Sequence, residues 1–386
     1  MNQAERRAGR RRHRRWPWIT AGAIAFALLL AAIGIPLLGA QALLTPHHGM
    51  TTSAGEVISI TDSEITLSKT SAGERVGTYG LLWDTPAGPQ TGTAIVGPVS
   101  ATTDSSVTRP ISGIVGELPV GTRVLLDPNV WDSDPQTALG IPYTSVDIEG
   151  QLGSMPAWRI DGDGSRWLLF VHGIDGLRQS ALRPLPTIVD AGLPALIISY
   201  RNDVGAPPSP NGLFALGETE WNDLEAAAQY AVEQGATEFV LYGDSMGGSI
   251  VTQFMHQSAY ADKVVGMVLD APVLNWSGVL QNQADRLYLG AFSGLLQLAV
   301  QWRGGIDLGV LDELDQTETF QRLPILLFQG LADPLVPPAE SEQFADSLPD
   351  AQYVPVPDAG HIQSWNVDPA SYESKLAAFL AQFSLS

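Results

Sequence analysis

Six short apolar runs, each ending in a turn, constrain the fold of this chain more than any other feature. The runs are WLLFVHG (167–173), ALIISY (195–200), FVLYG (239–243), VVGMVLD (264–270), ILLFQG (325–330) and YVPVPD (353–358). Helical stretches separate them, such as 219–235, where Trp221, Leu224 and Ala228 recur at helical spacing and Gly235 follows. Near-continuous apolar strands alternating with helices predict a mostly parallel sheet with helices on both faces. Active-site residues are then expected beyond the carboxyl ends of the strands.

The third run leads into GDSMG, which places Ser245 between Gly243 and Gly247. A tight turn from a strand into a helix strains its middle residue and leaves no room for β-carbons two positions before and after it. Residues 246–258 are predicted to form the helix, whose free N–H groups then face any oxyanion beside the serine. The pattern predicts Ser245 as a nucleophile at the edge of the sheet.

A serine nucleophile needs a base, which is nearly always histidine. Three of the six histidines (13, 47 and 48) lie near the N-terminus, and His172 belongs to the turn after the first run. His256 lies about 16 Å along the predicted helix from Ser245, at 1.5 Å per residue. His361 remains, on the loop PDAGHIQSW after the last run, and is the predicted base.

The acid that orients the imidazole has two candidates, Asp333 and Asp270, each following an apolar run. Asp333 lies in LADPLVP, between Ser245 and His361 in the chain. The order of the residues and the position in a loop favour Asp333. Asp244 and Asp358 are interpreted as turn residues.

The first run ends in FVHGIDG, where Gly173 permits the backbone to turn closely towards the serine. The N–H of Ile174 is therefore expected to pair with that of Met246 as an oxyanion hole. His172 then helps to hold the loop and is not required for the chemistry.

The N-terminus combines a basic tail with a long uncharged segment. Seven arginines lie in residues 1–15, and no residue from Trp16 to Pro46 is charged. We expect 1–15 to be cytoplasmic and 16–45 to be a transmembrane signal-anchor helix in contact with the lipid bilayer, with the rest of the chain extracytoplasmic. The small residues around Ala42 leave secretion after cleavage as an alternative, but the apolar segment is long for a signal peptide.

Residues 46–139 are predicted to form a linker and a small β-rich module. Short runs such as EVISIT and TRVLLD alternate with Gly, Pro, Ser and Asp turns, and no motif with a chemical mechanism is visible. The expected role of the module is that of a spacer before the domain at 140–386.

Composition excludes several function classes. Without cysteine, the chain has no disulfides, thiol nucleophiles or cysteine-ligated metals. Residues after the basic tail carry 14 of the 21 basic and 40 of the 41 acidic side chains, a balance that repels nucleic acid. No cluster with metal-ligand spacing is visible, so no metal or cofactor is expected.

With these motifs in view, residues from about 140 to 386 resemble an α/β-hydrolase. The HG turn, the GDSMG elbow and the order Ser, Asp, His are similar to serine hydrolases that include membrane-anchored bacterial esterases, monoacylglycerol-lipase-like enzymes and prolyl-oligopeptidase-type peptidases. The resemblance implies Ser245 as nucleophile, His361 as base and Asp333 as acid, with the N–H groups of Met246 and Ile174 as the oxyanion hole.

An ester hydrolase acting through an acyl-enzyme is the leading expectation. A serine peptidase and a non-catalytic envelope protein that retains the fold are the alternatives, and the substrate is an acyl compound or a peptide. Residues 274–323 are expected to form a cap. Its apolar side chains, among them Trp276, Leu280 and Trp302, either line a pocket for a hydrophobic group or pack the cap onto the core.

Overall fold

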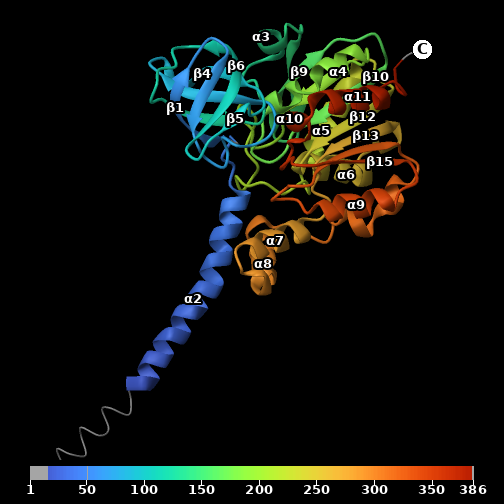
Figure 1. Ribbon diagram of the computed structural model, residues 1–386. Coiled ribbons are helices and arrows are strands. Elements are labelled where there is room, and N and C mark those ends of the chain that lie inside the picture. The colour runs from blue at the N-terminus through green and yellow to red at the C-terminus, as the bar shows by residue number, and fades with distance from the viewer. Residues whose placement is uncertain (1–15, 50, 385–386) are drawn as a thin grey trace, which may run out of the picture.

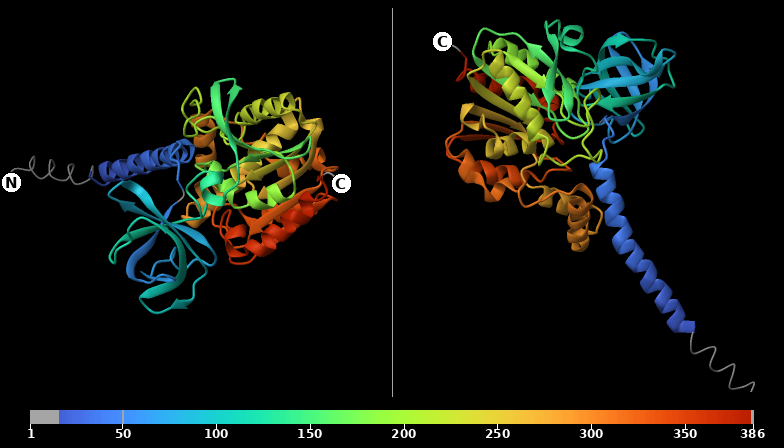
Figure 2. Two further views of the ribbon diagram at one scale, coloured as in Figure 1. Left: turned by 90° about the horizontal axis from the view of Figure 1, so that it is seen from above. Right: turned by 180° about the vertical axis from the view of Figure 1, so that it is seen from behind.

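The computed structural model describes residues 16–49 and 51–384 and divides them into a long helix, a β-barrel and an α/β domain (Figure 1). The views in Figure 2 place the barrel beside the α/β domain, with the helix extending away from both.

The long helix α2 (Trp16–Leu44) contacts the rest of the protein through its C-terminal end. Ala40 and Leu44 are fully buried there, and the Arg303 side chain of α8 (Ser293–Gly304) donates from Nε to Gln41 Oε1 at 2.7 Å. The sequence predicts a transmembrane span over 16–45. This prediction is not supported: in the part of the chain that the structure describes, no helix is both long and apolar enough to cross a membrane. The predicted tail 1–15 lies outside the described residues.

Residues 52–127 form an antiparallel barrel. The strands are β1 (Thr52–Ile60), β2 (Glu64–Ser68), β3 (Tyr79–Thr85), β4 (Gly88–Val96), β5 (Ala101–Thr102), β6 (Ser106–Val115) and β7 (Arg123–Asp127). Their order is β2-β1-β7-β3-β4-β6-β5, and an additional pairing of β2 with β6 closes the sheet. Alternate residues, such as Val124 and Leu126 of β7, point into a core of buried aliphatic side chains with Tyr79 and Trp83. Three of these strands, β3, β5 and β6, do not correspond to any run expected from the sequence.

Asp127, the last residue of β7, is a buried carboxyl, and burial raises its pKa to about 6, while the Asn129 N–H bond opposes the shift. The folded state therefore holds the proton more tightly than the unfolded state, so ionisation destabilises the fold progressively from about pH 4 to about pH 6. We expect Asp127→Asn to raise stability at pH 8 by at most about 3 kcal/mol and to change it little at pH 4. Thermal unfolding at both pH values measures this, and an equal change in Tm at both would contradict it.

The α/β domain contains a mostly parallel sheet, as predicted. Its strands are β8 (Thr144–Gly150), β9 (Gly153–Ile160), β10 (Arg166–Val171), β11 (Ala195–Ile198), β12 (Glu238–Asp244), β13 (Val264–Asp270), β14 (Ile325–Gly330) and β15 (Ala351–Val356). The order is β15-β14-β13-β12-β10-β11-β9-β8. The six predicted runs are β10 to β15, which pair in parallel. The antiparallel hairpin β8–β9 was not identified from the sequence.

Helices cover both faces of this sheet, since successive residues of a strand point to opposite sides. Leu169 of β10 belongs to one core with Ile250 of α6 (Met246–Gln257), whereas Leu168 belongs to a second core with Leu376 of α11 (Pro369–Leu380). The helices of this domain are α3 (Pro135–Leu139), α4 (Leu185–Asp190), α5 (Trp221–Glu233), α6 (Met246–Gln257), α7 (Trp276–Arg286), α8, α9 (Pro338–Asp346), α10 (Ser364–Val367) and α11 (Pro369–Leu380), with short 3-10 turns η1 (Arg178–Leu182), η2 (Ala261–Lys263), η3 (Gly290–Phe292), η4 (Glu313–Asp315) and η5 (Thr317–Phe320).

The segment between β13 and β14, where the sequence predicts a cap, is helical and is here named the cap region (Figure 1). Two of its predicted apolar residues, Trp276 and Leu280, are buried in the main core, and Trp276 Nε1 donates to Leu216 O at 2.8 Å. Leu298 and Trp302 are largely exposed. Some apolar residues of this region therefore pack into the core, and others are exposed on the surface.

Candidate active site

Ser245 lies on the turn between β12 and α6, in the strained conformation that the sequence predicts, with φ 52° and ψ −116°. A β-carbon on Gly243 would lie 2.6 Å from the carbonyl carbon of Gly247, and one on Gly247 would lie 2.1 Å from Val171 O. Both contacts are too short for any side chain. The two glycines therefore permit the close approach of β10, β12 and α6 that brings the serine to the sheet edge.

His361 contacts both other predicted triad residues. Its Nε2 lies 2.7 Å from Ser245 Oγ, and its Nδ1 lies 2.8 Å from Asp333 Oδ2. Because a carboxylate only accepts, Nδ1 carries the proton and Nε2 is left to accept from the serine hydroxyl. The loops after β14 and β15 supply the acid and the imidazole, so the three side chains meet at the carboxyl edge of the sheet.

Both oxygens of the Asp333 carboxylate accept hydrogen bonds. Its Oδ1 accepts from the N–H groups of Leu335 at 2.8 Å and Val336 at 3.1 Å. Gln329 Nε2 donates to Oδ2 at 3.2 Å, and Ser341 Oγ in turn donates to Gln329 Oε1 at 2.8 Å. Gln329 is fully buried. The sequence does not predict its role, because Gln329 is one residue of the expected strand 325–330. The one signal for it is a polar side chain within an otherwise apolar run.

Asp270, the alternative acid, has a different partner. Tyr372 Oη donates to its Oδ2 at 3.1 Å, and its backbone carbonyl accepts from Ser245 N at 3.0 Å. Burial raises the pKa of Asp270 to about 6, and the nearby Arg183 guanidinium opposes the shift.

Asp244 is not the simple turn residue that the sequence predicts, because it is the last residue of β12. Its Oδ2 lies 3.7 Å from Arg183 Nη2. Burial raises the pKa of the Asp244 carboxyl well above its usual range, and Arg183 opposes the shift.

The loop after β10 approaches the serine as predicted. A β-carbon on Gly173 would lie 2.8 Å from Ser245 Cβ, so the backbone that leads into Ile174 runs against the nucleophile. Met246 is the first residue of α6, where an N–H has no partner within the helix. The buried His172 holds this loop: its Nε2 lies 2.9 Å from Asp203 Oδ2, and its ring stacks on Tyr200.

Asp175, which follows Ile174, contacts the segment after α2, and the sequence does not predict this contact. It has a positive φ of 55° and accepts from His47 N at Oδ1 at 2.6 Å, while its carbonyl accepts from Gly49 N at 3.1 Å. The segment between α2 and the barrel is thereby attached to the loop that carries Ile174. Nothing in the local sequence pairs residues so far apart.

The remaining histidines lie apart from this site or outside the described residues. His256 Nε2 pairs with Glu313 Oε2 of η4 at 2.7 Å and connects α6 to the cap region. His13 falls outside the described residues.

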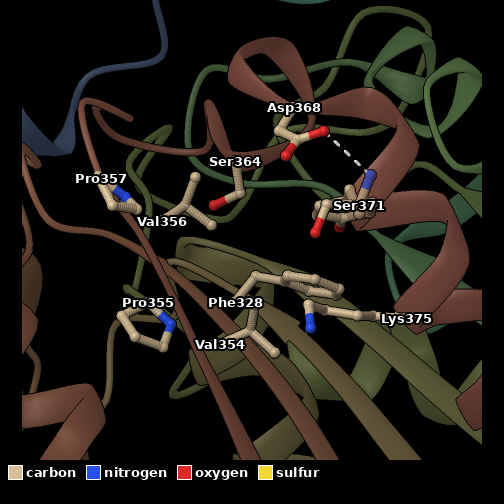
Figure 3. A pocket seen from close by; sticks show the side chains of 10 residues that line it. Phe328, Val354, Pro355, Val356, Pro357, Ser364, Asp368, Ser371 and Lys375 are labelled. Atoms are coloured by element: carbon tan, nitrogen blue, oxygen red, sulfur yellow. Dashed lines mark hydrogen bonds between the residues drawn. The ribbon is translucent and has the colours of Figure 1, made fainter.

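A separate pocket lies between β14, β15 and α11 (Figure 3). Phe328, Ser364, Tyr372 and Lys375 line it, and Asp368 Oδ1 accepts from Ser371 N at its rim. None of the predicted site residues lines this pocket. Over residues 16–49 and 51–384, no group of three or more His, Asp or Glu residues is arranged to hold a metal ion.

Comparisons with known families divide the chain in two. Residues 56–127 match a domain of unknown function (DUF8805), and residues 210–385 match the prolyl oligopeptidase family. The first match falls on the barrel, and the second covers the elbow and both loops that carry Asp333 and His361. No curated protein matches the sequence.

Solved structures share the fold of the α/β domain. Two crystal forms of the Pyrococcus furiosus esterase Pf2001 match with TM-scores of 0.52 and 0.53 at 18% and 19% identity, covering 66% of this chain and 98% and 96% of theirs. An esterase from Thermogutta terrifontis, with malate bound, has a TM-score of 0.47 at 19% identity over 63% of this chain and 100% of its own. The sheet order and the solved structures show that the α/β domain has the α/β-hydrolase fold, and the prolyl oligopeptidase match supports its assignment as a hydrolase of that superfamily.

Proposed function

We propose that this hydrolase cleaves carboxylic esters through an acyl-enzyme, with Ser245 as nucleophile, His361 as general base and Asp333 as the acid that orients the imidazole. The observation that supports the proposal is the continuous hydrogen-bonded chain from Ser245 Oγ to His361 at 2.7 Å and from His361 to Asp333 at 2.8 Å. A serine hydroxyl needs such an arrangement because it is a weak nucleophile at neutral pH.

The reaction proceeds in two acyl-transfer steps. His361 Nε2 takes the Ser245 proton as Oγ attacks the substrate carbonyl, and the N–H groups of Met246 and Ile174 stabilise the oxyanion. The imidazolium then gives its proton to the leaving alcohol, which leaves an ester on Oγ. Water, deprotonated by His361, attacks this ester; the bond to Ser245 Oγ breaks, the imidazolium returns its proton to Oγ, and the carboxylic acid is released. Asp333 keeps the Nδ1 proton in place throughout.

A serine peptidase is the second candidate, because residues 210–385 match the prolyl oligopeptidase family. The same three residues serve both reactions, since an amide differs from an ester mainly in the leaving group. The esterase reading is preferred because esters need less assistance to expel their leaving group, so the triad geometry alone is sufficient for them.

The two candidates are separated by substrate. We expect the purified full chain to hydrolyse p-nitrophenyl esters of short to medium acyl chains with kcat/KM at least about 10²-fold above that for aminoacyl p-nitroanilides. Steady-state rates across both series measure this ratio, and a ratio in favour of the anilides would support the peptidase. Absence of labelling of Ser245 by a fluorophosphonate probe would instead support a non-catalytic protein.

Location is a separate proposal that rests on the sequence alone. The seven arginines before an uncharged segment favour attachment to the cell membrane with the α/β domain on the extracytoplasmic side. Cell fractionation combined with protease treatment of intact cells checks this. Recovery of the full-length chain in the protease-protected cytoplasmic fraction would reject it.

A further inference from the structure

We infer that the β-barrel positions the catalytic base, and that Asn366 is the positioning residue through which it does so. The inference rests on the role proposed above for His361. His361 lies at the start of the segment 361–367, here named the base loop, and Asn366 lies near its end within α10. Figure 1 shows α10 beside the barrel.

Asn366 connects the base loop to the barrel through its side-chain amide nitrogen and its backbone carbonyl. Its Nδ2 donates to Thr78 O at 2.7 Å and to Pro128 O at 2.8 Å, and its backbone carbonyl accepts from Thr78 N at 2.8 Å. The side chain is fully buried. Because Thr78 and Pro128 immediately flank β3 and β7, the position of the barrel sets the position of Asn366.

The same asparagine is coupled to the residue after the base. Arg183 Nη1 donates both to Asn366 Oδ1 at 3.0 Å and to Ile362 O at 2.6 Å. Ile362 has a positive φ of 47°, a conformation that a β-branched side chain strongly disfavours. The backbone next to His361 is therefore strained, and the Arg183 and Asn366 contacts hold it in that state.

The barrel surface is shaped for this contact. Gly77 has a φ of +107°, and a β-carbon there would lie 2.1 Å from Asn366 O. Tyr79, the next residue but one, is buried and donates from Oη to Gln363 Oε1 of the base loop at 3.1 Å. Two barrel residues thus meet the loop directly, in addition to the bonds of Thr78.

The expected consequence is kinetic. A displacement of about 1 Å of a catalytic group costs on the order of 10² in rate, whereas ground-state binding of a substrate is less sensitive to the position of the base. Loosening the barrel from Asn366 should therefore lower kcat and leave KM nearly unchanged. A spacer has no such effect on the base.

Gly77→Ala tests the inference from the barrel side, because it changes no residue of the α/β domain. The matched control is Gly121→Ala, also in the barrel and also at positive φ (+88°), where a β-carbon has nothing within 4 Å. Both variants carry backbone strain, but only the first collides with Asn366. We expect Gly77→Ala to lower kcat by about 10- to 100-fold with KM within about twofold, and Gly121→Ala to retain wild-type kcat.

Two further readouts report on the base itself. In Gly77→Ala we expect slower labelling by a fluorophosphonate and a shifted or broadened proton NMR resonance for the Nδ1–H of His361, neither of which changes in Gly121→Ala. If Gly77→Ala does not fold, Tyr79→Phe replaces it, because this change removes only the hydroxyl, whose single proton is shared between Gln363 Oε1 and Val76 O. We expect Tyr79→Phe to lower kcat by roughly two- to fivefold.

The outcomes separate this inference from the proposed function. Equal kcat in Gly77→Ala and Gly121→Ala, or wild-type kcat in Tyr79→Phe where Gly77→Ala does not fold, overturns the positioning role while leaving the triad intact. An inactive wild-type chain that no fluorophosphonate labels overturns the proposed function, and with it the basis of the inference.

Discussion

Replacing Ser245 with alanine should lower kcat for ester hydrolysis by roughly 10⁴-fold or more, with the domain still folded. The Ser245 hydroxyl is the only group in the proposed mechanism that forms a covalent bond to the substrate carbonyl, so no other group of the site replaces it. Alanine keeps the β-carbon that the elbow already accommodates, and Ser245 caps no helix N–H with its side chain. Initial rates, together with thermal unfolding of both proteins, measure the two effects.

Ser249→Ala is the matched control for this variant. Ser249 is a buried serine within α6, four residues after Ser245, but its Oγ donates to Leu216 O at 2.8 Å and does not reach the base. We expect it to lose about 1 kcal/mol of stability and to keep kcat within a few-fold of wild type. Substantial esterase activity in Ser245→Ala would reject the nucleophile, whatever the control shows.

Asp333→Asn should lower kcat by about 10³- to 10⁴-fold at neutral pH. A carboxylate fixes the proton on Nδ1 of His361, whereas a carboxamide also presents an N–H, which favours the imidazole tautomer with its proton on Nε2. That tautomer cannot accept from Ser245. The side chain retains its size, so the bonds from Leu335 and Val336 to Oδ1 are expected to persist.

Asp270→Asn distinguishes the two carboxylates that the sequence left open. Asp270 Oδ2 accepts a hydrogen bond from the Tyr372 hydroxyl, and the side-chain oxygen of asparagine can accept the same bond. We expect kcat within about tenfold of wild type. A larger loss in Asp270→Asn than in Asp333→Asn, measured under the same conditions, would assign the acid to Asp270 instead.

The sequence was most informative where a physical constraint is local. Gly243 and Gly247 are predicted from the elbow pattern, and the structure shows the short approaches that exclude a side chain at each. Five of the six apolar runs become the buried strands β10 to β14, because a strand covered on both faces must be apolar along its whole length. The sixth becomes β15, a partly buried strand at the edge of the sheet. The hairpin β8–β9 was not predicted, because an edge strand has one exposed face and therefore mixes polar and apolar residues. In β8, exposed residues alternate with more buried ones.

The predictions for the N-terminal region had less support. Burial of Ala40 and Leu44 against the protein depends on where α8 lies, which hydropathy alone does not encode. The β-rich runs of the barrel are visible in the sequence, but its closure through β2 and β6 is not, because pairing between strands depends on the whole set of strands.

By itself, the sequence determined the alternation of strands and helices, the elbow and the residue types at the strand ends, because each depends on neighbours a few positions apart. Only the tertiary structure decided that Thr78 lies against Asn366, 288 positions away, and that Arg183 joins the base loop to Asp244. A hydrogen bond requires two groups within about 3 Å in space, a condition that separation along the chain does not specify.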